Sequence, residues 1–352
     1  MRTLAAILVA AVIVATPAHG AASCRWRVVL DRPGPELDGV AAVSSRDVWA
    51  VGDDGLRPTI LHWDGRRWRS VASRVFAFDV AAASANDVWA VGSSALGPGA
   101  SPRAEHWDGR RWRAVRVPGA AGEYLRAVAA VSRRDVWAVG ANERGQLIEH
   151  WDGRAWHRIG GGPVDGLLHG IDALSAGVIW AVGTQGMQTP GPRSEDALIE
   201  RWDGSRWRTQ PVVRLDWVND NMFGVDAVSP RNVWAVGSID ANGGYPVVQR
   251  WDGRAWSWVP TGGLPRARVT LSAVAVLSRE DVWVVGSSGF GSGERPVIAH
   301  WQRGRWSALQ GFLPRGGLNA VAALTRRDIW AAGGSQRAAG KSRSLVERYS
   351  CS

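Results

Sequence analysis

Two carboxylates interrupt apolar segments of the chain, where they could do chemistry. Asp172 and Asp226 each occupy a place at which matching segments elsewhere carry alanine. A buried carboxylate is costly unless it is hydrogen-bonded, paired or bound to a cation. Because Ca²⁺ prefers hard oxygen ligands, these two residues form a candidate calcium site. Hydrogen bonding to water or to the backbone is the alternative explanation.

A second set of candidates shares one position in a repeated segment, two residues before a valine or isoleucine. The neighbours of this position repeat, whereas the position itself holds an acid, a base, aromatics, a histidine and an amide. Such a mixture suits recognition of an irregular ligand, and drift at a solvent-exposed strand end is the alternative. The set comprises Asp38, Phe78, Arg126, His169, Phe223, Ser272 and Asn319. Trp217 is a further ligand-binding candidate, although loop packing explains it equally well.

Common catalytic motifs are absent from the sequence. It contains no Gly-x-Ser-x-Gly, no His-Glu-x-x-His and no phosphate-binding glycine loop. We therefore expect no catalytic residue and no resident cofactor, with a calcium ion as the open alternative. The competing functional hypothesis is a glycan lyase or hydrolase whose site includes His169, Asp172 and Asp226.

Internal repeats indicate which elements position these residues. The string Asp-Val-Trp-Ala-Val-Gly begins at Asp47, Asp87 and Asp135, and variants of it bring the total to seven copies. A Val-Ala-Ala-Val block precedes most copies, and a Trp-Asp-Gly-x-x-Trp string follows most of them. Each unit thus holds four short apolar runs of strand length, with Asp-Gly as a hairpin signal before the last run.

Seven units of four antiparallel strands predict an all-β, seven-bladed β-propeller. Of the 22 tryptophans, 20 fall at repeat positions. We expect these side chains to fill the wedges between blades, where each buries roughly 150–250 Å². An array of solvent-facing tryptophans for stacking sugars is the alternative.

The chain ends predict how the ring closes. The segment from Cys24 to Val29 resembles a fourth strand without its first three, and the segment from Leu345 to Cys351 resembles a third strand without a fourth. The last blade should therefore be completed by the N-terminal strand, which brings Cys24 beside Cys351. This placement predicts one disulfide, which in the chain-entropy model contributes on the order of 5 kcal/mol as an upper bound.

The strings quoted above resemble those of the Kelch/galactose-oxidase-like propellers of secreted bacterial proteins. Gly333-Gly334 even matches the double glycine of the Kelch pattern, and the resemblance covers nearly all of residues 24–351. Tectonin-type lectin repeats are also similar. This resemblance implies a fold but no particular activity, because such folds host enzymes, lectins and scaffolds. A galactose-oxidase-like copper site would need more tyrosines than Tyr124, Tyr245 and Tyr349.

Residues 1–20 predict a secretory signal peptide, and residues 21–352 the propeller. Arg2 precedes an apolar run from Leu4 to Ala15 that is too short to cross about 30 Å of hydrocarbon. We therefore expect a secreted or extracytoplasmic protein without a membrane span. Lipidation of Cys24 is disfavoured because Ala21-Ala22-Ser23 lacks a large aliphatic residue.

The loops between second and third strands and between blades should share one face, and their sequences vary. They include residues 93–103, 184–197, 238–245, 287–296 and 334–343. Binding sites tend to lie on loops carried by a rigid scaffold. The leading hypothesis is therefore a non-catalytic binding or scaffold propeller, expected to be monomeric, that recognises a protein or glycan partner through this variable loop face.

The opposite face carries arginines at the short third-to-fourth turns, and the net charge is +10. Contact between this rim and a polyanion is possible, and a solvated rim is the alternative. The arginines concerned are Arg66, Arg67, Arg69, Arg110, Arg111, Arg113, Arg206 and Arg208.

Overall fold

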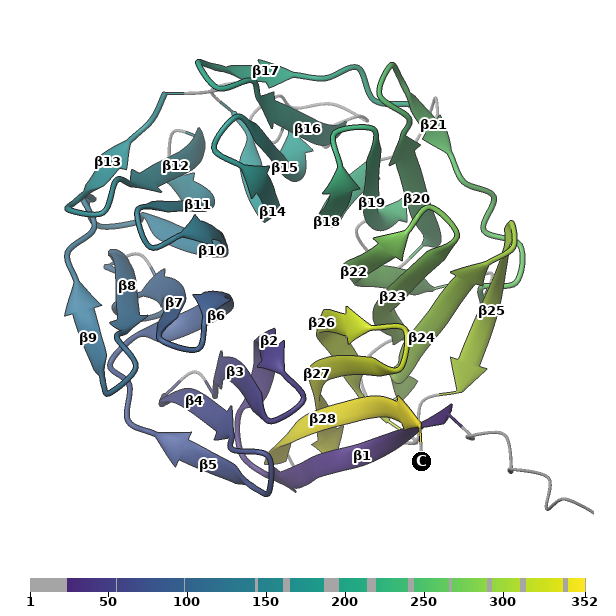
Figure 1. Cartoon of the computed structure of the whole chain (residues 1–352), viewed down its shortest axis with the longest axis horizontal. Helices are drawn as coiled ribbons and strands as arrows, with labels where there is room; N and C mark the ends of the chain where they lie inside the picture. The colour runs from purple at the N-terminus through teal and green to yellow at the C-terminus, as the bar shows by residue number, and fades with distance from the viewer. Residues whose placement is uncertain are drawn as a thin grey trace, which may run out of the picture.

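The computed structural model contains seven antiparallel sheets of four strands arranged in a ring (Figure 1). It describes residues 24–54, 56–97, 99–142, 145–160, 165–186, 196–213, 220–239, 244–265, 268–289, 293–310, 315–337 and 341–351. All structural statements below refer to these ranges. The signal peptide predicted for residues 1–20 lies outside them.

The strands are grouped here by their position in the blade, from the ring centre outward. The innermost strands are β2 (Glu36–Ser44), β6 (Phe76–Ser84), β10 (Tyr124–Ser132), β14 (Leu167–Ser175), β18 (Asp220–Ser229), β22 (Val269–Ser278) and β26 (Gly317–Thr325). The second strands are β3 (Asp47–Asp53), β7 (Asp87–Ser93), β11 (Asp135–Asn142), β15 (Val178–Gln185), β19 (Asn232–Ile239), β23 (Asp281–Ser288) and β27 (Asp328–Arg337). The third strands are β4 (Pro58–Trp63), β8 (Pro102–Trp107), β12 (Gly145–Trp151), β16 (Asp196–Trp202), β20 (Tyr245–Trp251), β24 (Arg295–Gln302) and β28 (Lys341–Cys351). The outermost strands are β5 (Trp68–Val71), β9 (Trp112–Val115), β13 (Trp156–Arg158), β17 (Trp207–Thr209), β21 (Trp256–Trp258), β25 (Arg305–Gln310) and β1 (Cys24–Pro33).

The last blade is completed by the first strand, as the sequence predicts. Strand β1 pairs antiparallel with β28 in the sheet order β1-β28-β27-β26, and the two strands run side by side in Figure 1. Cys24 lies opposite Cys351 in this ladder, and the two form a disulfide across 327 residues of sequence. The prediction of a ring closed by the two chain ends is thus confirmed.

The hydrophobic core is divided into clusters that each lie between two neighbouring blades. Each second-strand tryptophan packs against the aromatic side chains of the third and outermost strands of the next blade. Trp49, for example, is 1% exposed and contacts the rings of Trp107 and Trp112 at centroid distances of 5.0 and 5.2 Å. Because edge and tilted contacts of this kind add to burial, the tryptophans act as wedges that fix the angle between blades. The solvent-facing alternative does not hold for the second-strand tryptophans, which are at most 2% exposed.

The Asp-Gly hairpins between third and outermost strands form as expected. In the first of them, Gly65 adopts a left-handed φ of 88°, and the Asp64 carboxylate accepts hydrogen bonds from the backbone N–H groups of Arg66 and Arg67. The side chain of Arg69 also donates to Asp64 at 2.7 Å. Together these donors lower the pKa of Asp64 to about 2. The short-turn face therefore consists of tight, self-contained turns.

Each innermost strand contains a β-bulge near its start. In β2 the register with β3 shifts between Leu37 and Gly39, which leaves Asp38 without a partner in the ladder. Gly52 lies opposite Leu37, and a Cβ atom at Gly52 would collide with the carbonyl oxygen of Glu36. The same shift, with the final glycine of the Val-Trp-Ala-Val-Gly string or its variant opposite it, recurs in all seven blades. The repeated glycine is therefore the residue that makes room for the bulge.

Candidate functional site: the channel mouth

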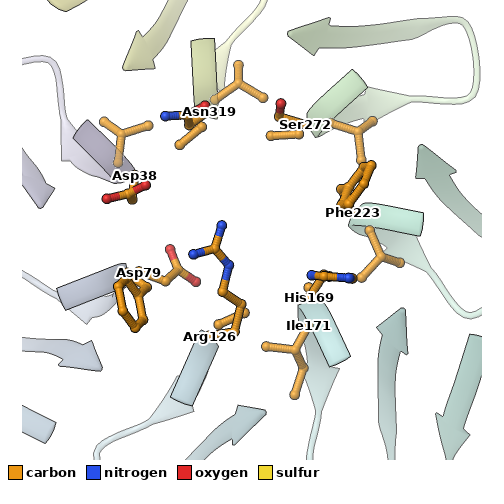
Figure 2. Close-up of a pocket in the computed structure, with 18 residues that line it drawn as sticks. Asp38, Asp79, Arg126, His169, Ile171, Phe223, Ser272 and Asn319 are labelled. Atoms are coloured by element: carbon orange, nitrogen blue, oxygen red, sulfur yellow. The ribbon is translucent and has the colours of Figure 1, made fainter. Parts of the chain in front are cut away.

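The seven variable residues predicted from the repeat meet in one cavity at the mouth of the central channel. Its volume is about 250 Å³, and its wall includes Asp38, Phe78, Arg126, His169, Phe223, Ser272 and Asn319. Figure 2 shows labelled side chains of several blades arranged around the centre of the ring. Asp79 and Ile171 also line this cavity.

The bulges explain why these residues share the cavity. Every one of the seven is the extra residue at the register shift of its innermost strand. A bulge leaves one residue unpaired and re-aims its side chain. The position can therefore vary in size and charge, because its side chain lies outside the interfaces that the tryptophans fill.

Arg126 extends from β10 toward the middle of the ring in Figure 2. Its guanidinium carbon lies 5.4 Å from the centre of the Phe78 ring, within the range of a cation–π contact. Phe78 in turn meets Tyr124 edge to face at 6.2 Å. Within the described part of the chain, the Arg126 guanidinium makes no hydrogen bond or ion pair, so its donors are available to a ligand.

Two carboxylates share the cavity with Arg126. The Asp79 carboxylate accepts the N–H groups of Val80 at 2.8 Å and of Val128, in the next blade, at 2.9 Å. Burial nevertheless raises the pKa of Asp79 to about 6, against the opposing effect of these two hydrogen bonds. Burial raises the pKa of Asp38 to about 7; the positive charge of Arg126 opposes this rise, and nearby acids add to it.

The remaining polar members of the ring are neutral. Asn319 donates hydrogen bonds of 3.1 Å to both the Glu36 side chain and the Leu37 carbonyl, which joins the last blade to the first. Burial, helped by the charge of Arg126, lowers the pKa of His169 to about 4, so its imidazole is uncharged at neutral pH. His169 also meets Phe223 edge to face at 5.1 Å.

A second, larger hollow of about 690 Å³ opens beside the cavity on the variable loop face. The loop after β7 contributes Ala95, Leu96 and Ala100 to its wall, and Tyr124 at the start of β10 contributes an aromatic side. Four residues belong to both hollows, so the two are continuous: Phe78, Arg126, His169 and Phe223. We call this second hollow the loop groove.

The proposed carboxylate pair lies elsewhere and is engaged with the backbone. Asp172 accepts the N–H of Ala227, and Asp226 accepts the N–H of Val276, in each case from the next blade. Burial and the charge of Asp226 hold the pKa of Asp172 well above its usual range. Neither residue lines the channel-mouth cavity, so they do not form one site with His169. Within the described ranges no three His, Cys, Asp or Glu residues are grouped to hold a metal ion. Both carboxylates accept the N–H of Ala227, and calcium binding by this pair stays a prediction.

Some predicted features fall wholly or partly outside the described residues. Trp217 lies outside them, so its proposed role stays a prediction. Parts of all five variable loops also lie outside them, within 93–103, 184–197, 238–245, 287–296 and 334–343.

The arginine rim is partly neutralised within the protein. Arg69, Arg113 and Arg208 each pair with the aspartate of their own hairpin at 2.6–2.7 Å. Polyanion binding by the remaining arginines stays a prediction.

Sequence reasoning missed a half-buried network formed by the repeat strings. In four blades the first residue of the Asp-Val-Trp string contacts the histidine of the third strand, and this histidine stacks on the tryptophan. The Nε2 of His106 lies 2.6 Å from the Asp87 carboxylate, which also accepts the indole N–H of Trp89. The other pairs are Asp47–His62, Asp135–His150 and Asp281–His300. The available signal was the joint presence of aspartate and histidine in these four blades. Arg201 and Arg250 replace the histidine where the aspartate is missing, and in the last blade Arg348 takes its place and pairs with Asp328.

No helix in the described ranges is long and apolar enough to cross a membrane. No protein-family model matches the chain, and no curated protein does either.

Solved structures share the fold. The structure of YCF48 bound to D1 peptide has a TM-score of 0.61 and 13% identity, covering 92% of this chain and 96% of that one. YCF48 from Cyanidioschyzon merolae has a TM-score of 0.61 and 12% identity over 94% of this chain and 99% of its own. The WD40 β-propeller domain of Doa1 has a TM-score of 0.61 and 13% identity over 93% and 97%, respectively. At these identities the likeness establishes the seven-bladed, WD40-like propeller fold alone; it does not confirm the Kelch resemblance.

Proposed function

We propose that this protein is an extracytoplasmic binding propeller that recognises a protein or glycan partner through its variable loop face. The observation that carries the proposal is the set of seven different residues at one equivalent bulge position, all lining one cavity. If this position had only a structural role, we would expect the same residue type in every blade, as is the case for the second-strand tryptophans.

Two further observations support this proposal. A disulfide between the chain ends is typical of proteins in oxidising compartments. Large apolar side chains are also exposed at the loops between second and third strands. Leu56, Leu96 and Tyr245 have exposed fractions of 83%, 47% and 61%. Of these three, Leu96 lines the loop groove beside the cavity.

A catalytic role has no comparable support. Of the three residues that the enzyme hypothesis needs together, only His169 lines the cavity. With a pKa of about 4, this imidazole could not act as a proton donor near neutral pH. We therefore assign the site to binding.

The test uses the purified, disulfide-intact protein against a random peptide display library and a glycan array. A loop-face variant carries Leu56→Asp, Leu96→Asp and Tyr245→Asp. A matched variant of the opposite face carries Arg66→Asp, Arg110→Asp and Arg154→Asp, all of which are exposed.

We expect probes retained by the wild-type protein to lose binding to the loop-face variant and to keep binding to the matched variant. Retention of no probe, or loss on the opposite-face variant alone, would refute the proposal.

A further inference from the structure

Arg126 stands where the channel-mouth cavity meets the loop groove, and it lines both. Its only ring contact in the described part of the chain is with Phe78. An arginine guanidinium presents a planar set of donors that matches a carboxylate. The junction therefore offers a positive charge to an incoming ligand.

The neighbouring acids leave this charge available. Both oxygens of Asp79 already accept backbone N–H groups, which disperse the negative charge of this carboxylate. Asp38, which faces Arg126, Asp79, Asp53 and Glu36, has a pKa raised to about 7. A protonated Asp38 can donate a hydrogen bond to an anion that Arg126 holds.

The wall below the ring residues is aliphatic. It is formed by Val40, Ile171, Val225, Val274 and Val321. An anionic group would lose its hydration there without gaining a partner, so its stable place is at the level of Arg126. A charged end group fits this geometry better than a chain that continues down the channel.

The loop groove fits apolar side chains. Leu96, Ala95 and Ala100 provide aliphatic contacts, and Phe78 and Tyr124 meet at an interplanar angle of 85°. Together these aliphatic and aromatic walls suit the apolar side chains of a peptide.

We propose that the site takes the C-terminal end of a peptide, with the terminal carboxylate on Arg126 and the preceding apolar side chains in the loop groove. This inference rests on the proposed binding function and names the ligand class. Capture of a terminal carboxylate is an established mode of peptide recognition.

The experiment compares two synthetic pools of N-acetylated hexapeptides, measured by fluorescence anisotropy with the purified, disulfide-intact protein. The last three positions are mixtures of Ala, Val, Leu and Phe. One pool ends in a free carboxylate and the other in an amide. We expect the acid pool to bind at least about tenfold more tightly, because amidation removes the charge-assisted pair.

Three variants test whether the preference for the acid pool arises at this site. Arg126→Gln should abolish the preference for the acid pool, while Leu96→Ser should weaken both pools by a similar factor. Arg110→Gln removes the same charge from an exposed position on the opposite face and should change neither pool. Circular dichroism and thermal melting confirm that each variant is folded.

A second measurement follows from Asp38. A bound carboxylate raises the pKa of Asp38 further, so binding takes up a proton and the affinity should fall as pH rises through about 7. Asp38→Asn should flatten this dependence.

Equal binding of the two pools, an acid preference that survives Arg126→Gln, or binding of neither pool would overturn the inference. The proposed function survives these outcomes if other peptides or glycans bind and lose binding on the loop-face variant. It fails separately if no probe depends on that face.

Discussion

At the scale of single residues, buried carboxylates connect neighbouring blades. Asp79, Asp172 and Asp226 each accept a backbone N–H from the innermost strand of the next blade. Burial raises the pKa of all three. These contacts connect the blades and favour the ionised carboxylates, whereas burial costs free energy whenever the carboxylates are ionised.

Because of this cost, we expect the protein to be most stable at a mildly acidic pH rather than at neutral pH. The pKa of Asp79 is about 6 in the folded protein and 3.8 in the reference state, so the folded protein binds more protons between these values. Stability should therefore fall as pH rises through this window, by up to about 3 kcal/mol for Asp79 alone. Urea unfolding at several pH values between 4 and 7 measures the slope. Asp79→Asn should reduce the slope, and an unchanged slope would contradict the assignment.

The half-buried Asp–His pairs predict a second stability effect. Among the described residues, His106→Ala leaves the Asp87 carboxylate, whose side chain is 3% exposed, with only the Trp89 N–H as partner. We expect a loss of about 2–4 kcal/mol in the free energy of unfolding. His157→Ala is the matched control, because His157 pairs with Asp152 while 54% exposed and should cost less than about 0.5 kcal/mol. Denaturant unfolding at pH 7 should separate the two variants; equal losses would argue against a role for the half-buried network.

At the scale of elements, the bulge and its opposing glycine form one unit. Each innermost strand gains an extra residue that faces the channel, and the last glycine of the second strand makes room for it. The blade can therefore keep its packing while its channel residue changes.

Gly140→Ala tests this unit in the blade that carries Arg126. The added Cβ would collide with the Tyr124 carbonyl oxygen, so the bulge must shift or the strands must separate. We expect a loss of about 3 kcal/mol in stability. Gly160→Ala, where nothing lies within 4 Å, should stay within about 0.5 kcal/mol of wild type. Thermal melting distinguishes the two, and a neutral Gly140→Ala would show that the bulge does not need the glycine.

The strands and turns also differ in how well the sequence predicted them. Tryptophan spacing and Asp-Gly turns predicted the blades because they repeat in register. Variation at one position predicted the seven cavity residues, but their bulged conformation depends on strand register, which no single position reveals. Asp79 was missed although it stands where other blades have Gly or Ala, which is the kind of signal that identified Asp172 and Asp226. The loop groove was missed because the residues that correspond to Leu96 and Tyr124 in other blades do not share one role, so the repeat gave no signal.

At the scale of the whole molecule, the ring depends on its last blade. The pairing of β1 with β28 and the disulfide both hold the chain ends together. Trp26 and Tyr349 continue the aromatic packing by contacting Trp283 of the previous blade. The closure therefore combines a covalent bond with the same wedge that joins the other blades.

Replacing both cysteines by serine should lower stability without opening the ring. The chain-entropy model gives a loss on the order of 5 kcal/mol as an upper bound. Urea unfolding with and without a reductant measures it: the reductant should destabilise the wild-type protein and leave the double variant unchanged. A reductant effect of equal size on both proteins would place the lost stability elsewhere.

The placement of Cys24 and Cys351 has a practical consequence. Strand β1 begins and β28 ends on the face of the Asp-Gly hairpins, across the disc from the cavity and the loop groove. A tag or surface attachment joined next to either residue thus emerges on the far side of the disc. A protein immobilised in this way holds its channel mouth toward solution, where an approaching molecule meets it without obstruction.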